Sequence, residues 1–335
     1  MFEHWQKVCC FVNRDCNLRC RGCNVINHTT SVELNLVKWM KAFDILKSRG
    51  VGFVVLFGGE PTLRDDLPYM VEYLNEIGMP HTIITNGIRM MNDEKYYKHL
   101  ISVKPYGIST SVNTLAAIDA HHDNKKSVIG GELLLKLKED LPKCDLVANM
   151  AVTRQNIETL PSLVEHFTKK GIWSILSFFH VCPPSESLYW WYRGPETEDN
   201  AELVFRNVPA DKRVIDRIAN TFIRQYDRYK LHNQKAYFEA WVKYGIEQNW
   251  HCHEWVCPAI NPDGSLMACI DRPLNRSFSI FDLAKDNLDI EIYKTFQNTI
   301  ADCRRGCFWD HMYETNKYAA ENRADEGKRN FAHEK

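Results

Sequence analysis

The sequence lacks any apolar run near the roughly 20 residues that a membrane-spanning helix requires. Its N-terminal stretch, MFEHWQKVCCFVNRDC, is interrupted by charged and polar side chains and does not predict a signal peptide. An excess of one charge is also lacking, because the formal net charge is -1, which argues against bulk nucleic acid as a partner. These absences lead us to expect a cytoplasmic protein that is not bound to a membrane.

Cysteine, by contrast, is abundant, with 12 residues. A reducing cytoplasm does not normally keep so many as disulfides. Eight of them fall into two groups, at residues 16–23 and 252–307, and such clustering predicts metal binding rather than crosslinks. The other four are interpreted as buried thiols: Cys9, Cys10, Cys144 and Cys182.

Short apolar runs alternate with amphipathic stretches through the first half of the chain. Such alternation predicts parallel βαβ units, and six strands are too few for a closed eight-fold barrel. We therefore expect an α/β fold with a partial (β/α)6 TIM-like barrel, whose working residues follow the C-terminal ends of the strands. The predicted strands are 7–13, 52–58, 81–86, 106–113, 146–153 and 172–181. The predicted helices between them are 36–46, 67–74, 130–141 and 157–171.

The composition changes along the chain and suggests four parts. The barrel core is expected at 1–182, a helical and aromatic insert at 183–250, a small hairpin and helix domain with the second cysteine group at 251–315, and a charged tail at 316–335. Long helices are predicted at roughly 210–230 and 233–249. The insert could cover the barrel mouth as a substrate lid or simply pack against the barrel. Its aromatic and basic residues are Tyr189, Trp190, Trp191, Tyr192 and Arg193.

The loop after the first predicted strand, DCNLRCRGC, holds three cysteines in a C-x3-C-x2-C spacing with no fourth cysteine beside them. An iron–sulfur cluster usually takes four cysteines, so three would leave one iron open to a substrate or cofactor. Structural zinc would need a fourth ligand, and His28 does not give a usual zinc spacing. The metal ligands predicted here are Cys16, Cys20 and Cys23.

This loop, together with Gly-Gly-Glu-Pro at residues 58–61 after the second strand, resembles the radical S-adenosylmethionine (radical SAM) enzymes. The resemblance covers about residues 1–181. It implies a [4Fe–4S] cluster on the three loop cysteines, with S-adenosylmethionine (SAM) chelated by the fourth iron. One electron, from a donor such as flavodoxin or ferredoxin, would cleave SAM to a 5′-deoxyadenosyl radical.

The resemblance also implies roles for residues at later strand ends. Gly58 and Gly59 would let the backbone approach the ligand, and Glu60 would receive the ammonium of SAM. Further candidates for the ribose or carboxylate of SAM are Ser111, Asn113 and Arg154. The chain departs from many relatives in having Asn113 in place of aspartate. It also has Gly22 where an aromatic residue often packs by the adenine.

The second cysteine group surrounds a predicted hairpin whose turn is Asn-Pro-Asp-Gly, residues 261–264. If Asn261 pairs with Ser265, Cys257 falls opposite Cys269. The pattern resembles the auxiliary-cluster domain called SPASM, in its short "twitch" form, and implies one auxiliary [4Fe–4S] cluster; a zinc ribbon is the alternative. Five candidates compete for four places: Cys252, Cys257, Cys269, Cys303 and Cys307.

The substrate remains open at this level. We expect an enzyme acting on a small molecule such as a nucleoside, sugar or cofactor precursor. The alternatives are modification of a ribosomally made peptide, which the early first strand weakens because such enzymes often carry a preceding leader-binding domain, and a non-catalytic iron–sulfur or zinc protein. Cys182 follows the sixth predicted strand and is a candidate hydrogen-atom donor, with a buried structural thiol as the alternative reading.

Overall fold

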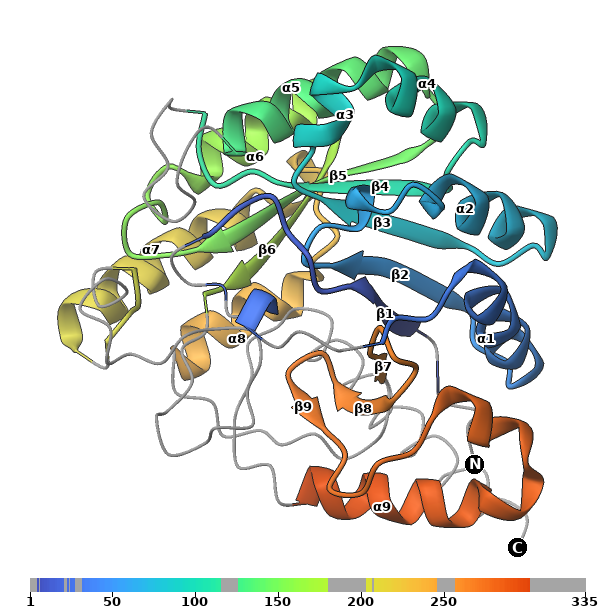
Figure 1. Cartoon of the computed structure of the whole chain (residues 1–335). Helices are drawn as coiled ribbons and strands as arrows, with labels where there is room; N and C mark the ends of the chain where they lie inside the picture. Colours follow the sequence, from blue (N-terminus) through green and yellow to red (C-terminus); the bar gives the residue numbers. More distant parts are fainter. Residues whose placement is uncertain are drawn as a thin grey trace, which may run out of the picture.

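The computed structural model describes residues 5, 7–20, 23, 25–27, 32–115, 126–179, 203–206, 208–245 and 257–301. The strands of this part form one nine-stranded sheet in the order β6-β5-β4-β3-β2-β1-β7-β8-β9 (Figure 1). The strands are β1 Lys7–Asn13, β2 Phe53–Gly58, β3 His81–Thr85, β4 Gly107–Ser111, β5 Asp145–Val152, β6 Trp173–Phe178, β7 Ala259–Ile260, β8 Leu266–Cys269 and β9 Arg272–Pro273. The α-helices are α1 Leu36–Ser48, α2 Leu67–Glu76, α3 Ile88–Asn92, α4 Glu94–Ser102, α5 Lys126–Asp140, α6 Leu160–Lys169, α7 Pro209–Arg224, α8 Lys235–Tyr244 and α9 Asp289–Ala301.

Strands β1 to β6 pair in parallel in chain order, so all six predicted strands are confirmed. At least one α-helix connects each strand to the next, because two parallel strands need a long crossover connection. In the described part of the chain, β6 and β9 form the two edges of the sheet, which therefore does not close. The partial barrel expected from the sequence is the observed architecture.

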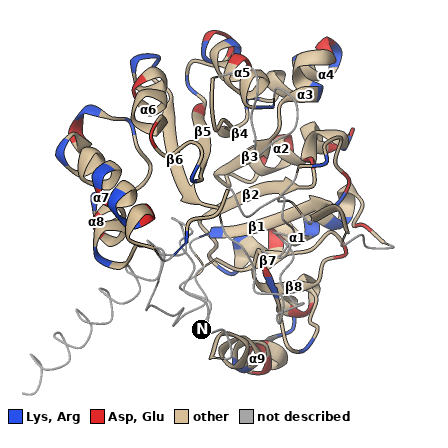
Figure 2. Cartoon of the chain, turned by 90° about the vertical axis from the view of Figure 1, so that its left-hand side faces the viewer, with Lys and Arg blue, Asp and Glu red and all other residues tan. Residues whose placement is uncertain are grey.

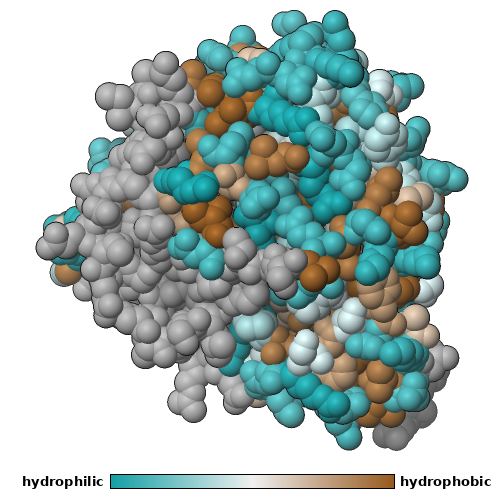
Figure 3. Space-filling view, in the orientation of Figure 1, coloured by the Kyte–Doolittle hydropathy of each residue, from teal (hydrophilic) through white to brown (hydrophobic). Residues whose placement is uncertain are grey.

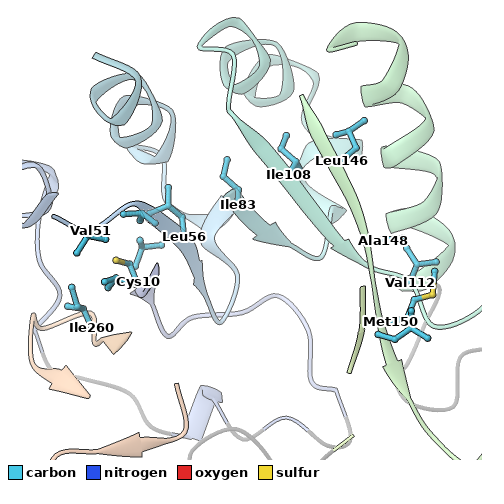
Figure 4. Close-up of a cluster of buried hydrophobic side chains, with 14 of the residues drawn as sticks. Cys10, Val51, Leu56, Ile83, Ile108, Val112, Leu146, Ala148, Met150 and Ile260 are labelled. Atoms are coloured by element: carbon cyan, nitrogen blue, oxygen red, sulfur yellow. The ribbon is translucent and has the colours of Figure 1, made fainter. Parts of the chain in front are cut away.

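One face of the sheet packs against the helices and forms the main core. Alternate strand residues such as Cys10, Leu56, Ile83 and Ile108 are completely buried there, as the period of two in a strand dictates. Figure 4 shows this layer running from Ile260 of β7 across the sheet to the β5 residues. Most of the apolar positions that predicted α1 and α2 are buried, namely Phe43, Leu46, Leu67, Met70 and Leu74. Leu36 and Met40 are only half-buried, and the buried face of α1 also contains Trp39 and Ala42.

Two helices between β3 and β4 were not predicted. Helix α4 buries Tyr96, Tyr97 and Leu100, and Asp93 caps it by accepting a hydrogen bond from the Tyr96 amide at 3.0 Å. Asp93 is a residue type that favours the N-cap of a helix, and its place before the apolar residues of α4 could have predicted this helix. Helix α5 begins at Lys126, earlier than the expected residue 130.

The opposite face of the sheet carries a second, smaller apolar layer. Cys9 and Phe11 of β1 and Val55 and Phe57 of β2 contribute to it, and the rings of Phe11 and Phe57 lie 4.1 Å apart between centroids. Val25 and four residues of the C-terminal segment complete the layer; the four are Cys257, Ala259, Met267 and Ile270. We call this set the inner layer, because it faces away from the main helix-covered core.

The predicted hairpin is present, with the expected register. Ala259 pairs with Met267, Asn261 donates its amide to the Ser265 carbonyl at 2.9 Å, and Gly264 turns the chain with φ +88°. The sequence did not reveal that β7 also pairs in parallel with β1, Cys9 lying opposite Ala259. The hairpin therefore extends the barrel sheet itself, and α9 lies beneath it in Figure 1.

The other end of the sheet is covered by the segment from α7 to α8. Leu231 forms a parallel bridge with Ser174 of β6, and the Asn233 side chain accepts from the Leu176 amide at 2.8 Å and donates to the Leu176 carbonyl at 2.9 Å. These contacts satisfy backbone groups that an open edge would expose. Helices α7 and α8 are shorter than the ranges expected from the sequence.

Charged side chains concentrate on the outer helices, while the strands are almost free of them (Figure 2). On the face shown in Figure 3, hydrophobic residues form separate small groups among hydrophilic ones. Among the helices that the structure describes, none combines the length and the apolar character needed to cross a membrane.

Candidate functional site

The predicted site residues of the barrel lie at one edge of the sheet. The cysteine loop follows β1, Glu60 follows β2, Asn113 follows β4 and Arg154 follows β5. Because β1 to β6 are parallel, their C-terminal ends meet at this edge, where a barrel of this kind places its chemistry. The structure therefore places these residues after the strand ends, while their contacts to a ligand remain predictions.

Gly58 and Gly59 bring the end of β2 against the backbone that leads into the cysteine loop. A Cβ on Gly58 would collide with Asn13, and one on Gly59 would collide with the carbonyls of Arg14 and Asp15. Backbone hydrogen bonds fix this approach, from the Gly59 amide to the Asn13 carbonyl at 3.1 Å and from the Glu60 amide to the Asp15 carbonyl at 2.7 Å. Gly58 and Gly59 thus allow two chain segments to approach each other closely, while their approach to a ligand stays a prediction.

Glu60 is buried and accepts hydrogen bonds from donors in the turn after β2 and at the end of β3. Its Oε1 accepts from the Thr62 amide at 3.0 Å, the Thr62 hydroxyl at 2.5 Å and the Thr85 hydroxyl at 2.6 Å. Its Oε2 accepts from the Asn86 amide at 2.7 Å. The carboxylate therefore joins the ends of β2 and β3 beside the cysteine loop, and Oε2 keeps acceptor capacity for a further donor.

Asn86 connects the end of β3 to the cysteine loop. Its Oδ1 accepts from the Ile88 amide at 3.0 Å, so its Nδ2 is directed at the loop. There Nδ2 donates to Asn17 Oδ1 at 2.7 Å and lies 4.0 Å from the sulfur of Cys16. No role was predicted for this residue from the sequence. The sequence feature that could have suggested a role is the position of Asn86 at the end of a predicted strand, in Thr85-Asn86-Gly87.

Cys16 sits in an environment shaped by burial and nearby charges. Burial raises the pKa of its thiol to about 11, and the negative charges of Glu60 and Cys23 act in the same direction. The Leu18 amide, which donates to Cys16 Sγ at 3.4 Å, and the positive charge of Lys126 oppose this rise. A metal centre would displace the thiol proton, since the thiolate is the ligand.

Arg14 is a buried cation at the start of the cysteine loop. Its guanidinium lies 3.9 Å from the ring centroid of Phe11 and donates to Asn261 Oδ1 in the hairpin turn. Burial lowers its pKa to about 10, while negative charge on Asp263 and Cys23 raises it, so the side chain is charged at neutral pH. Arg14 thus ties the loop to the C-terminal hairpin.

The hairpin turn also contacts Leu34, which lies after the cysteine loop in the sequence. The Leu34 amide donates to the Pro262 carbonyl at 2.7 Å, and a Cβ on Gly264 would lie only 3.2 Å from the Leu34 side chain. The turn therefore contacts the chain on both sides of the cysteine loop.

Asn113 and Arg154 have different surroundings. Asn113 is buried, its Oδ1 accepts from the Ala151 amide at 2.8 Å, and its Nδ2 has no hydrogen-bond partner among the described residues. A buried donor of this kind suits an acceptor supplied by a ligand. Arg154 is exposed and lies 3.3 Å from Asp211 of α7, and Ser111 ends β4 at the same edge.

The predicted metal-binding cysteines that the structure describes lie in two places, the loop after β1 and the C-terminal hairpin segment. In the loop, the Cys23 amide donates to the Cys20 carbonyl at 3.1 Å, and Cys23 and Cys269 both pack against the inner layer. Cys257 lies in the inner layer with its sulfur 3.6 Å from that of Cys9. Among the residues that the structure describes, no three His, Cys, Asp or Glu side chains stand close enough to form a ready metal site. Four candidates lie outside the described residues: Cys182, Cys252, Cys303 and Cys307.

The loop fits an iron–sulfur cluster by its donor chemistry. It offers three thiols of the kind that hold such clusters, and N–H groups of Leu18 and Asn86 face the sulfur of Cys16. The orphan donor of Asn113 stands at the same edge of the sheet, where a bound cofactor would need polar partners.

Comparison with known families agrees with this site. Residues 11–137 match the model of the radical SAM superfamily. The match includes the cysteine loop and strands β2 to β4, and in this part the chain is similar to the radical SAM superfamily, which uses a [4Fe–4S] cluster and SAM.

Individual relatives differ in what they act on. The chain is 27% identical over 174 residues to the Fe-coproporphyrin III synthase of Methanosarcina barkeri, covering 51% of this chain and 42% of that protein. It is 26% identical over 277 residues to a probable GTP 3′,8-cyclase of Methanococcus maripaludis, covering 78% of this chain and 83% of that protein. The chain therefore spans less than half of the synthase and most of the cyclase.

A solved structure shows the same fold. Streptococcus suis SuiB bound to precursor peptide SuiA matches with a TM-score of 0.63 and 17% identity, over 90% of this chain and 68% of that one. At this level of identity the likeness concerns the fold alone.

Proposed function

We propose that this chain cleaves SAM reductively at a [4Fe–4S] cluster held by Cys16, Cys20 and Cys23, and uses the resulting radical to modify a small molecule in biosynthesis. The observation that carries the proposal is the three-cysteine loop at the C-terminal edge of the parallel sheet, within the segment that matches the superfamily. When bound, the cluster would supply one electron and an open iron for SAM. We further propose a cytoplasmic enzyme that receives its electron from a flavodoxin or ferredoxin.

The chain's own residues would orient the ligand and exclude water. Asn113 has a buried donor available for an oxygen of SAM, and Glu60 has acceptor capacity for its ammonium. Phe11 of β1 and Phe57 of β2 give the inner layer a buried apolar surface on the two strands that lead to the site. A dry site of this kind protects reactive intermediates from side reactions.

A nucleoside or other small cofactor precursor is the substrate class that we favour. Support comes from the match to the GTP cyclase, which extends over most of both chains. A ribosomally made peptide is the second candidate, supported by the fold likeness to SuiB in its complex with a precursor peptide. Arg154 and Ser111 remain candidates for SAM contacts, and Cys182 remains a candidate for returning a hydrogen atom to the substrate radical.

We also propose an auxiliary [4Fe–4S] cluster in the C-terminal segment, with a zinc ribbon as the alternative. The hairpin brings Cys269 to the end of β8, and β8 packs on α9, which leads toward Cys303 and Cys307 in sequence. A single cluster would take four of the five cysteines of this segment.

The proposal is tested by anaerobic reconstitution followed by electron paramagnetic resonance (EPR) spectroscopy. The reduced wild-type protein should show a [4Fe–4S] signal that changes when SAM is added, because the open iron binds SAM directly. Cys16→Ala, Cys20→Ala and Cys23→Ala should lose this SAM-responsive signal. Cys144→Ala, which removes a thiol beside β5, is the matched control and should keep it. A SAM-responsive signal in any of the three loop variants would contradict the assignment.

A further inference from the structure

The side-chain amide of Asn86 is fixed in orientation by its own surroundings. Oδ1 is engaged by the Ile88 amide at 3.0 Å, and the Asn86 backbone amide donates to Glu60 Oε2 at 2.7 Å. The residue is 5% exposed. Since an amide group carries its two hydrogens on the nitrogen, the Asn86 donors lie on the side of the cysteine loop.

The loop offers an acceptor for each hydrogen. Nδ2 lies 2.7 Å from Asn17 Oδ1 and 4.0 Å from Cys16 Sγ. The same sulfur accepts the Leu18 amide at 3.4 Å. Two N–H groups therefore face the first predicted ligand of the cluster, one from the loop itself and one from the end of β3.

We propose that Asn86 is a positioning residue for the iron–sulfur cluster, which anchors the loop through Asn17 and donates an N–H group to the sulfur of Cys16. The inference rests on the proposed function, because it assumes a cluster on the three loop cysteines. Hydrogen bonds to the cysteine sulfurs are among the factors that set the reduction potential of such clusters. A donor stabilises the more negative, reduced state, so Asn86 raises the reduction potential of the cluster.

This role also gives Glu60 a second function. By accepting the amides of both Thr62 and Asn86, its carboxylate sets the position of the β3 end relative to β2. A displacement of Glu60 would move the Asn86 donor away from Cys16. Partners beyond the direct ligands commonly orient metal ligands in this way and tune the metal.

The test is an EPR-monitored redox titration of the reconstituted, full-length protein without SAM. The cluster is identified beforehand by its response to SAM. Asn86→Leu removes both donors without adding charge, and Asn86→Asp removes them while keeping the oxygen that accepts from Ile88. At the potential where half of the wild-type cluster is reduced, we expect the ratio of reduced to oxidised cluster to be about tenfold lower in both variants, which is 59 mV for one electron.

Two control variants separate the possible causes. Asn17→Ala removes the anchor but leaves the donor to Cys16, so we expect a shift of less than a third of that in Asn86→Leu. Asn92→Asp adds a charge at an exposed position at the end of α3 and should leave the potential unchanged. Iron per chain is measured for every variant, so that the titration compares equally loaded proteins.

The outcomes are distinct. Asn86 variants with normal iron and an unchanged potential would overturn this inference and leave the proposed function standing. A shift only in Asn86→Asp would assign the effect to charge, and an equal shift in Asn17→Ala would assign it to loop position; both would overturn the sulfur contact. Absence of a SAM-responsive cluster from the wild-type protein would contradict the proposed function and the inference together.

Discussion

The sulfur atoms of Cys9 and Cys257 lie 3.6 Å apart in the buried seam between β1 and the residue pair that precedes β7. Cys257 is 1% exposed and belongs to the inner layer, whereas Cys269 is only partly buried at the end of β8. Packing in the seam thus gives Cys257 a structural role that does not require a metal.

The first prediction concerns the auxiliary cluster. Because Cys257 is committed to the seam, we expect Cys252, Cys269, Cys303 and Cys307 to be the four ligands. Cys257→Ala should keep the iron content of the wild type, while Cys269→Ala should lose about four iron atoms per chain, the content of one cluster. Iron and zinc analysis after anaerobic reconstitution provides the measurement. Equal iron loss in both variants would reject this choice of ligands, and about one zinc per chain in the wild type would support the ribbon.

The second prediction concerns Gly59, whose Cβ would strike the carbonyls of Arg14 and Asp15. Gly59→Ala should lower the free energy of unfolding by about 1–3 kcal/mol, the usual cost of overpacking, and should reduce cluster loading because the root of the cysteine loop must move. Chemical denaturation and iron analysis measure the two effects.

Gly131→Ala in α5 is the matched control for this change. A Cβ there meets its nearest neighbour, Phe167, at 3.7 Å, which is ordinary contact, and alanine favours helix. This variant should keep or slightly increase stability. A Gly59→Ala protein as stable as Gly131→Ala would show that β2 does not need to approach the loop so closely.

The third prediction concerns the Glu60 carboxylate. In Glu60→Gln an NH2 group would face donors from Thr62, Thr85 or Asn86, so we expect a loss of about 1–3 kcal/mol in the free energy of unfolding. Glu132→Gln makes the same chemical change on the exposed surface of α5 and should have little effect. Denaturant unfolding of both variants measures the difference, and equal stabilities would contradict the buried network.

The fourth prediction concerns pH and His81, at the start of β3. The ring is buried, with Nδ1 3.0 Å from the Met79 carbonyl and Nε2 accepting from the Tyr106 amide at 3.4 Å. Burial lowers the pKa of His81 below its ordinary value of 6.5. The unfolded chain therefore binds the proton more readily, and the contribution of neutral His81 is complete above pH 6.5 and declines as the pH falls below it.

The measurement is the free energy of unfolding at pH 7.5 and at pH 5.5 for wild type and His81→Asn. The wild type should lose more stability than the variant over this interval, at a rate that cannot exceed about 1.4 kcal/mol per pH unit for one proton. An identical pH dependence in the two proteins would show that His81 does not titrate differently on folding.

The sequence was sufficient for the features that depend on local pattern. Apolar runs with β-branched residues predicted all six parallel strands, and the turn at residues 261–264 predicted the register of the hairpin. These predictions were correct because the alternation of side chains along a strand and the residue types of a turn depend on residues that are close in the sequence. Helix α4 was missed because tyrosines fill its buried face and its cap at Asp93 was not recognised.

Features that depend on distant parts of the chain were not predictable in the same way. Three contacts join residues that are far apart in the sequence and come together only in the folded chain. They are the parallel pairing of β7 with β1, the hydrogen bond from Arg14 to Asn261 and the salt bridge between Arg154 and Asp211. The direction of the Asn86 amide follows from Ile88 and Glu60 together, so the motif alone could not assign its contact with the loop.

The most direct test of the central claim is the formation of 5′-deoxyadenosine from SAM. The anaerobically reconstituted protein is reduced with dithionite, incubated with SAM and analysed by liquid chromatography with mass spectrometry. We expect 5′-deoxyadenosine from the wild type and from Cys144→Ala, and none above the protein-free background from Cys16→Ala, Cys20→Ala or Cys23→Ala. A fully loaded wild-type protein that forms no 5′-deoxyadenosine with candidate nucleotides or peptides present, or a loop variant that forms as much as the wild type, would contradict the account.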